Sequence, residues 1–231
     1  MEPRETEYTT VKTTLPRVPY PAIEDRTPVM TQRLVIRALT ENDLPALHTL
    51  RTVEEVMQGL ICTSPNDQTT YNFAIVEQET GSFVGIGGSH IRADHQGWPV
   101  VGYLFHPDVW GKGYATEFLE AFLKMWWALP RDEFEIAVEA SSAEMARFDS
   151  RGGDVGEGNR VKELMIGVTQ DNNVASAKVL TKCGQTYSTG SRRPPSEEAY
   201  TTEEAGGEWG WGLGAGGWAQ PNRAVPYNVQ I

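Results

Sequence analysis

VGYLFHPDVWGKGYATEFLEAFL, at residues 101–123, is the stretch that decides the fold of this chain. It opens with an apolar, strand-like run that Pro107 closes, because proline cannot donate to a strand ladder. Two glycines, Gly111 and Gly113, then form a turn, and a strongly apolar run with helical character follows as far as Leu129. The stretch therefore predicts a strand, a glycine turn and a long helix that adjoin directly.

The glycine turn, WGKGYAT at residues 110–116, is suited to holding an anion. Glycines let successive backbone N–H groups point toward one place, and a helix N-terminus adds partial positive charge. Pyrophosphate is therefore one candidate ligand, and a tight turn without any ligand is the alternative. Two other phosphate motifs fit less well. Lys112 precedes Gly113 rather than the Ser or Thr of a Walker A loop, and GIGGSH at 85–90 lacks the last glycine of a dinucleotide fingerprint.

Strands and helices alternate on both sides of this stretch. Alternating apolar residues predict strands, whereas apolar residues spaced by three or four predict helices. These patterns place a strand at 31–39, a helix capped by Thr40, a hairpin at 72–91, a strand at 163–170 and a helix at 172–183 that Gly184 ends. The last strand and helix repeat the order found at 101–123, so we expect the two strands to be parallel neighbours.

Three segments lack such patterns. Residues 1–28 are rich in Pro, Thr and charge, which predicts a flexible N-terminal tail. Residues 139–160 are dominated by Ala, Ser, Gly and charge, and we expect an insertion loop there. Residues 191–231 are rich in Gly and Trp, and the alternatives for them are disorder or a degenerate closing hairpin. One domain is therefore expected over residues 31–187.

Composition excludes several classes of protein. The net charge of −11 over 231 residues argues against a nucleic-acid-binding surface, which is usually basic. Cys62 and Cys183 have no metal-ligand spacing, so no metal is expected. No apolar run approaches the roughly 18 residues of a membrane-spanning helix, and the N-terminus has no signal-peptide pattern. We therefore expect a cytoplasmic protein with neither a nucleic acid nor a membrane as its partner.

Three blocks of the sequence resemble the GNAT superfamily of acetyl-CoA-dependent N-acetyltransferases, and most closely the branch that includes the ribosomal-protein alanine acetyltransferases. They are TQRLVIRALTENDLPAL at 31–47, the stretch at 101–123 and DNNVASAKVLTKCG at 171–184, in the order that the family requires. The resemblance implies an α/β GNAT fold. In that fold helices flank a mixed central sheet that is mostly antiparallel, with one parallel pair of strands splayed at the cofactor site.

The resemblance also implies that acetyl-CoA is the cosubstrate, and it assigns residues to this molecule. The backbone amides of the glycine turn bind the pyrophosphate, and a backbone N–H near Leu104 or Phe105 faces the thioester. Trp110 occupies a position where the superfamily often has Arg or Gln, Asn173 lies on the pantetheine arm and Ser176 lies near the sulfur. The implied cofactor-binding residues are Leu104, Phe105, Trp110, Gly111, Lys112, Gly113, Tyr114, Ala115, Thr116, Asn173 and Ser176.

Acetyl transfer needs a proton donor for the leaving thiolate and a base for the amine. Leu180 stands where the superfamily often has a tyrosine acid, so Ser176 is the candidate acid. A carboxylate often found before the Gly-Tyr pair is missing too, because Val100 and Val101 stand there. The general base is not assigned to a single residue, and the candidates are His90, Asp94, His95 and His106. Of these, His106 is taken as the catalytic candidate beside Ser176.

We therefore expect an enzyme that moves an acetyl group directly to a primary amine, on a small molecule or at a protein N-terminus. Two departures from the family support an alternative, a catalytically weak or inactive acyl-CoA-binding protein. Only ICTSPNDQTT at 61–70 stands where a second helix is usual, and no closing hairpin is evident beyond Gly184.

Overall fold

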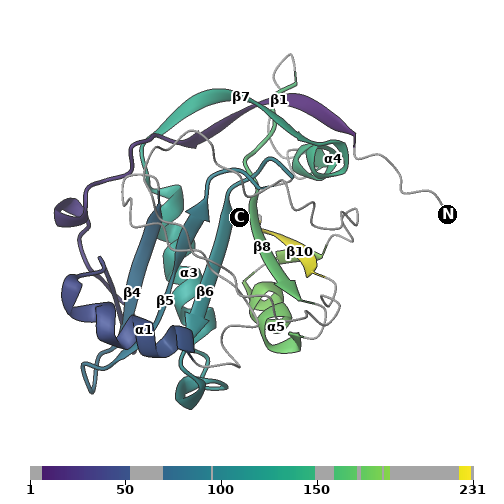
Figure 1. Ribbon diagram of the computed structural model, residues 1–231. Coiled ribbons are helices and arrows are strands. Elements are labelled where there is room, and N and C mark those ends of the chain that lie inside the picture. The colour runs from purple at the N-terminus through teal and green to yellow at the C-terminus, as the bar shows by residue number, and fades with distance from the viewer. Residues whose placement is uncertain are drawn as a thin grey trace, which may run out of the picture.

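The computed structural model describes residues 7–52, 70–94, 96–148, 159–170, 173–183, 185–187 and 224–229. Its centre is a mixed sheet of eight strands in the order β2-β3-β4-β5-β6-β8-β10-β9 (Figure 1). The strands are β2 (Val29–Met30), β3 (Leu34–Arg37), β4 (Tyr71–Glu77), β5 (Phe83–Ile91), β6 (Val100–Phe105), β8 (Met165–Gln170), β10 (Ala224–Val229) and β9 (Gln185–Tyr187). All neighbours are antiparallel except β6 and β8, which run parallel. The predicted α/β fold is therefore confirmed.

Helices cover both faces of this sheet (Figure 1). α3 (Tyr114–Trp127) packs on one face, because its buried residues recur at helical spacing and meet Phe73 and Ile75 of β4. The buried residues of α3 are Tyr114, Phe118, Leu119, Phe122, Leu123 and Trp126. α1 (Leu44–Thr52) lies on the other face, where Leu50 contacts Ile86 and Leu104. α5 (Val174–Lys182) lies beside α3 and contacts β8.

β6 and β8 pair at only one end. Their register joins Val100 to Ile166 and Val101 to Gly167, and no further pair follows although β6 continues to Phe105. Gly167 leaves room for a side chain of α5, since a Cβ built there would lie 2.6 Å from a terminal carbon of Leu180. The two strands therefore part toward their carboxyl ends, which is the splayed parallel pair that the resemblance predicted.

Residues 8–16 form a strand rather than a mobile tail. β1 (Tyr8–Pro16) pairs antiparallel with β7 (Arg131–Glu139) along its whole length, in the two-stranded ribbon at the top of Figure 1. Val11, Thr13 and Leu15 alternate with exposed or half-buried neighbours and are themselves buried. The prediction of a flexible tail over residues 1–28 is therefore wrong for this strand. A composition rich in Thr and Pro conceals a short alternation that becomes stabilising only when a distant strand pairs with it.

The predicted insertion loop at 139–160 also contains regular structure. α4 (Ala140–Phe148) follows β7 directly, whereas residues 149–158 lie outside the described part of the chain. The ribbon, α4 and the segments that lead into β6 and β8 enclose a second core, made of Val11, Trp98, Val100, Val138, Ala143, Ala146, Val161, Leu164 and Ile166. Val100 and Ile166 are themselves a pair of the parallel register, so this core holds the paired ends of β6 and β8 together.

β9 and β10 add strands at the edge of the sheet beyond β8. β10 lies between β8 and β9 and pairs antiparallel with both. The sequence left disorder and a degenerate hairpin as alternatives for residues 191–231, and within that range Ala224–Val229 forms a strand. Residues 191–223 and 61–69, which include Cys62, lie outside the described residues. None of the helices that the structure does describe is long and apolar enough to cross a membrane.

If β1 belongs to the folded core, shortening one of its buried side chains should destabilise the whole protein. Leu15 is only 4% exposed, so Leu15→Ala is expected to lower the free energy of unfolding by about 2–5 kcal/mol. Ile23, in the same N-terminal segment, is 41% exposed, and Ile23→Ala should cost no more than about 1 kcal/mol. Urea unfolding of both variants provides the comparison. Equal and small losses would mean that residues 1–28 behave as a tail.

Candidate functional site

The glycine turn lies where β6 ends and α3 begins, on the side where β6 and β8 part. A single 3-10 turn, η3 (Pro107–Val109), leads into it. Gly111 and Gly113 then take positive φ angles of 73° and 83°. Residues with a Cβ seldom adopt this left-handed conformation, so the two glycines are required by the path of the backbone itself.

The first turn of α3 presents backbone donors to solvent. Gly113 is the N-cap and makes no side-chain capping bond. The first N–H groups of any helix have no acceptor within the helix, so those of Tyr114, Ala115 and Thr116 are available to an anion. Gly111 is open on its outer side, since a Cβ built there would meet no described heavy atom within 4 Å. The turn and helix end therefore fit the pyrophosphate that the sequence predicted for them.

Trp110 fastens the turn to the end of β6. Its indole N–H donates to the Phe105 carbonyl at 2.8 Å, while the side chain remains exposed (51%). A strand carbonyl that has no neighbouring strand to pair with needs another hydrogen-bond donor, and here the Trp110 indole N–H is that donor. Trp110 stands at the position where the superfamily often has Arg or Gln, and in this chain its side chain thus ties the glycine turn to β6.

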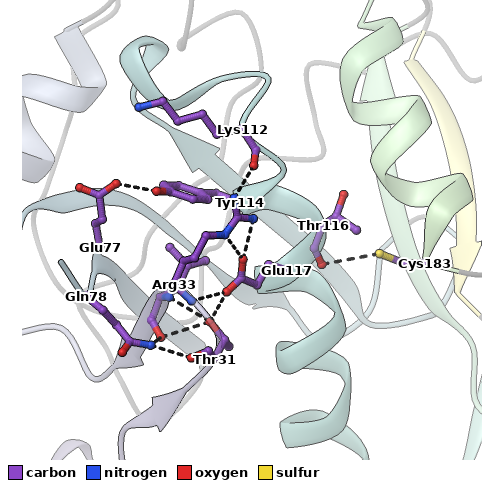
Figure 2. Close-up of polar contacts among 10 residues, drawn as sticks. Thr31, Arg33, Glu77, Gln78, Lys112, Tyr114, Thr116, Glu117 and Cys183 are labelled. Carbon is purple, nitrogen blue, oxygen red and sulfur yellow. Dashed lines mark hydrogen bonds and ion pairs between the residues drawn. The ribbon is translucent and has the colours of Figure 1, made fainter.

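An arginine at the start of β3 clamps the turn from the opposite side (Figure 2). The Arg33 guanidinium donates to the Lys112 carbonyl at 2.8 Å and to the Glu117 carboxylate at 2.8 Å. It also lies 4.6 Å from the centre of the Tyr114 ring, in cation–π geometry. One side chain thus contacts the turn, the first turn of α3 and an aromatic ring. The sequence placed Arg33 in a block that resembles the family but gave no sign of this role.

Glu117 is the acceptor at the centre of this clamp. Its carboxylate accepts from the Thr31 hydroxyl at 2.6 Å and from the Arg33 backbone N–H at 2.7 Å, in addition to the guanidinium. Burial alone raises the pKa of Glu117, but these hydrogen bonds outweigh it and bring the pKa below its usual value. The carboxylate is therefore charged at neutral pH, and it ties α3 to β3.

Tyr114 connects the same region to the β4–β5 hairpin. Its hydroxyl donates to the Glu77 carboxylate at 2.5 Å, as Figure 2 shows. This hydrogen bond raises the pKa of Tyr114 and lowers that of Glu77. Tyr114 was assigned to the cofactor, but its side chain is buried, so only its backbone N–H is open to a ligand.

α5 forms the other wall of the gap between β6 and β8. Asn173 is its N-cap, and the side-chain oxygen accepts from the Ser176 backbone N–H at 3.0 Å. The Ser176 hydroxyl lies 3.4 Å from the Tyr103 hydroxyl of β6, which donates to it. Leu180 is buried against Gly167 and offers no polar group to the site. The structure therefore places Ser176 beside β6. It also places the Tyr103 hydroxyl next to Ser176, although the sequence analysis did not select Tyr103 as a site residue.

The direction of the backbone amides of β6 separates Leu104 from Phe105. Ile166 of β8 donates to the Pro99 carbonyl, and the His106 N–H donates to Val84 of β5. Amides of a strand point alternately to its two neighbours, so the N–H groups of residues 101, 103 and 105 point toward β8. Beyond Val101 that side of β6 is unpaired. Phe105 is therefore the better oxyanion donor, and the N–H of Leu104 points to β5.

The four candidate bases lie in different places. His106 is half-exposed beside the turn, and its Nδ1 lies 3.4 Å from both the backbone N–H and the carboxylate of Asp108. His90 of β5 is largely buried, and burial lowers its pKa to about 4, so it is neutral at pH 7. Asp94 accepts from two backbone N–H groups in the turn before β6, and His95 lies outside the described residues. Of the three candidates that the structure describes, His106 alone is adjacent to the glycine turn.

Known proteins resemble this chain in sequence pattern and in fold. A model of the acetyltransferase (GNAT) domain matches residues 33–186. An acetyltransferase from Agrobacterium tumefaciens has a similar structure, with a TM-score of 0.52 and 17% identity over 92% of this chain and 97% of that one. A ribosomal-protein-serine acetyltransferase-like protein from Vibrio cholerae gives a TM-score of 0.50 and 15% identity over 88% of this chain and 97% of that one. At these identities the two structures support the fold.

Removing the Arg33 clamp should weaken binding of coenzyme A, the ligand expected from the sequence. Arg33→Met keeps the apolar stem but deletes the donors to Lys112 and Glu117. Because hydrogen bonds to charged groups contribute about 1.5–3 kcal/mol, the affinity should fall roughly 10- to 100-fold. Arg17→Met is the matched control, since it removes another arginine–carboxylate pair, with Asp132 on the ribbon. Calorimetric titration of both folded variants checks this, and equal affinities would remove Arg33 from the site.

Proposed function

The chain belongs to the GNAT acetyltransferase family, and on this premise we propose that it transfers the acetyl group of acetyl-CoA directly to a primary amine. The observation that carries the proposal is the glycine turn at the start of α3, placed where β6 and β8 part. A helix end and a gap between parallel strands together supply what an acyl-CoA needs. The first receives its phosphates, and the second receives its thioester arm.

For the cofactor, the proposal assigns the backbone amides of the turn to the pyrophosphate. The N–H groups of Gly111, Gly113, Ala115 and Thr116 surround the helix end, and Trp110 and Arg33 hold the turn in place. The Lys112 side chain is exposed beside them and can pair with a phosphate. These local donors allow a chain with a net charge of −11 to bind a polyanion. Asn173 remains the proposed contact for the pantetheine arm.

For the chemistry, the proposal places the thioester carbonyl at the Phe105 N–H. A neutral amine attacks the carbonyl carbon, a C–N bond forms, and the N–H donor stabilises the charge that develops on oxygen. The C–S bond then breaks, its electron pair goes to sulfur, and Ser176 donates the proton that completes the thiol. The proton lost by the amine passes to solvent or to His106, whose weak bond to Asp108 must open for its Nδ1 to accept it.

The proposed acceptor is an amine on a small molecule or at a protein N-terminus. The test is calorimetric titration of the full chain with acetyl-CoA, followed by measurement of thiol release with a panel that includes polyamines, small monoamines and peptides with free N-termini. Binding together with thiol release from at least one amine supports the proposal. Binding without turnover on any of them favours an acyl-CoA-binding protein, and absence of binding contradicts the assigned turn.

Ser176→Ala should slow turnover far more than it weakens binding. General acid assistance is typically worth about 10²- to 10⁴-fold, whereas one neutral hydrogen bond is worth about 0.5–1.5 kcal/mol, or roughly tenfold at most, in affinity. Thr181→Ala is the control, because it removes a hydroxyl from the same helix that donates only to the Ala177 carbonyl. Steady-state rates and calorimetry separate the two effects. If Ser176→Ala kept turnover within a few-fold of wild type, Ser176 would not be the general acid, and water would have to take this role.

A further inference from the structure

We propose that Tyr103 is a positioning residue for the Ser176 hydroxyl: it orients this group toward the thioester sulfur and replaces the proton that the serine gives up. This inference rests on the proposed function. Tyr103 lies two residues beyond Val101, the last residue of β6 that pairs with β8, and its side chain reaches the first turn of α5. It thus spans the two walls of the gap in which we place the thioester.

Packing and a capping hydrogen bond hold the Tyr103 ring and the Ser176 backbone in place. The Tyr103 ring lies 6.0 Å from the Phe105 ring and 6.4 Å from the Phe118 ring, so aromatic packing holds its orientation. Ser176 is fixed by the bond from its backbone N–H to the Asn173 cap. The 3.4 Å separation between the hydroxyl oxygens is long for this type of bond, and such contacts often shorten when substrate binds.

The direction of the bond determines what Ser176 can do. The proposal requires Tyr103 to donate, so that a lone pair of the serine oxygen is occupied and the serine's own proton is directed elsewhere. A serine hydroxyl is also a far weaker acid than a phenol, and a serine that gives up its proton must recover one at once. The neighbouring phenol is the group placed to supply it.

The proton transfer balances in the following way. As the C–S bond breaks, the Ser176 O–H proton moves to sulfur and the Tyr103 O–H proton moves to the Ser176 oxygen. The negative charge ends on the tyrosine oxygen rather than on an alkoxide. The amine releases one proton when the C–N bond forms, and through solvent this proton restores Tyr103. No oxidant, metal or further reactant is required.

The surroundings keep Tyr103 protonated before each cycle. Burial raises its pKa to about 12, the bond with Ser176 lowers it, and the nearby Cys183, the residue that follows α5, raises it. Cys183 itself stays a thiol, because burial and the charge of Glu120 on α3 raise its pKa to about 11, although Lys182 acts in the opposite sense. Cys183 is the titratable group that faces Tyr103 among the described residues. The phenol is therefore a donor throughout the neutral pH range.

A double-mutant cycle tests the coupling. Tyr103→Phe should lower kcat roughly 10- to 100-fold and leave the KM for acetyl-CoA almost unchanged, because misorientation of a catalytic group costs about this much. In the Ser176→Ala background, the same change should cost almost nothing further. Tyr71→Phe is the control, since it removes another buried phenol of the sheet that does not contact Ser176. Equal losses in both backgrounds, or no loss at all, would overturn the proposal.

A ring-fluorinated tyrosine at position 103 gives a readout independent of turnover. It keeps the shape of the side chain and lowers the phenol pKa into a range where absorbance can follow it. Removal of the Ser176 hydroxyl should raise that pKa, because the bond between the two groups lowers it. With Ser176 present, kcat should fall as pH rises through this pKa, since the deprotonated ring cannot supply a proton.

The two readouts separate the possible failures. Coupled titration together with an alkaline loss of kcat supports the role of Tyr103. Turnover that does not follow the titration of the fluorinated ring overturns this role and leaves the proposed function intact. Coupled titration without thiol release from any amine overturns the proposed function, and the role of Tyr103 with it.

Discussion

The Arg33–Glu117 ion pair determines where the glycine turn lies, and the rest of the site depends on it. Two glycines with positive φ give the turn its path, but glycine also leaves a chain free to adopt other paths. The Arg33 guanidinium restricts the turn to one path, because it donates hydrogen bonds to the Lys112 carbonyl inside the turn and to the Glu117 carboxylate in α3. The backbone donors at the start of α3 are thereby fixed before any ligand arrives, so binding does not have to order them.

The separation of β6 and β8 at their carboxyl ends is the second constraint. It arises because the two ends of these strands have different neighbours. At the amino ends, Val100 and Ile166 pair and are covered by the second core, which includes Val11 of the ribbon. Beyond Val101 the pairing ends, the indole of Trp110 takes the Phe105 carbonyl, and α5 approaches. The ribbon thus stabilises the end where the strands meet, and leaves the other end open for a ligand between them.

The gap is lined by groups from three elements rather than by one motif. β6 supplies the backbone N–H of Phe105 and the phenol of Tyr103, α5 supplies Ser176, and the turn with α3 supplies the backbone amides that we propose for the phosphates. Each of these groups is held by a neighbour that does not meet the ligand, such as the Asn173 cap beneath Ser176. A site of this kind needs rigid supports more than it needs charged side chains, which agrees with our proposal that this acidic protein binds an anion.

The sequence by itself determined the strand–turn–helix segment at 101–123 and the helix that contains Ser176, and its resemblance to a known family implied the mixed α/β fold. The segment and the helix depend on local periodicity, on glycine φ angles and on capping, all of which act over a few residues. Tertiary structure alone decided the rest. Arg33 and Glu117 are 84 residues apart, Tyr103 and Ser176 are 73 apart, and β1 finds its partner in β7 at 131–139. A side chain whose partner lies far along the chain has the same local pattern as one that faces solvent, so only the folded chain shows that it belongs to a site or a core.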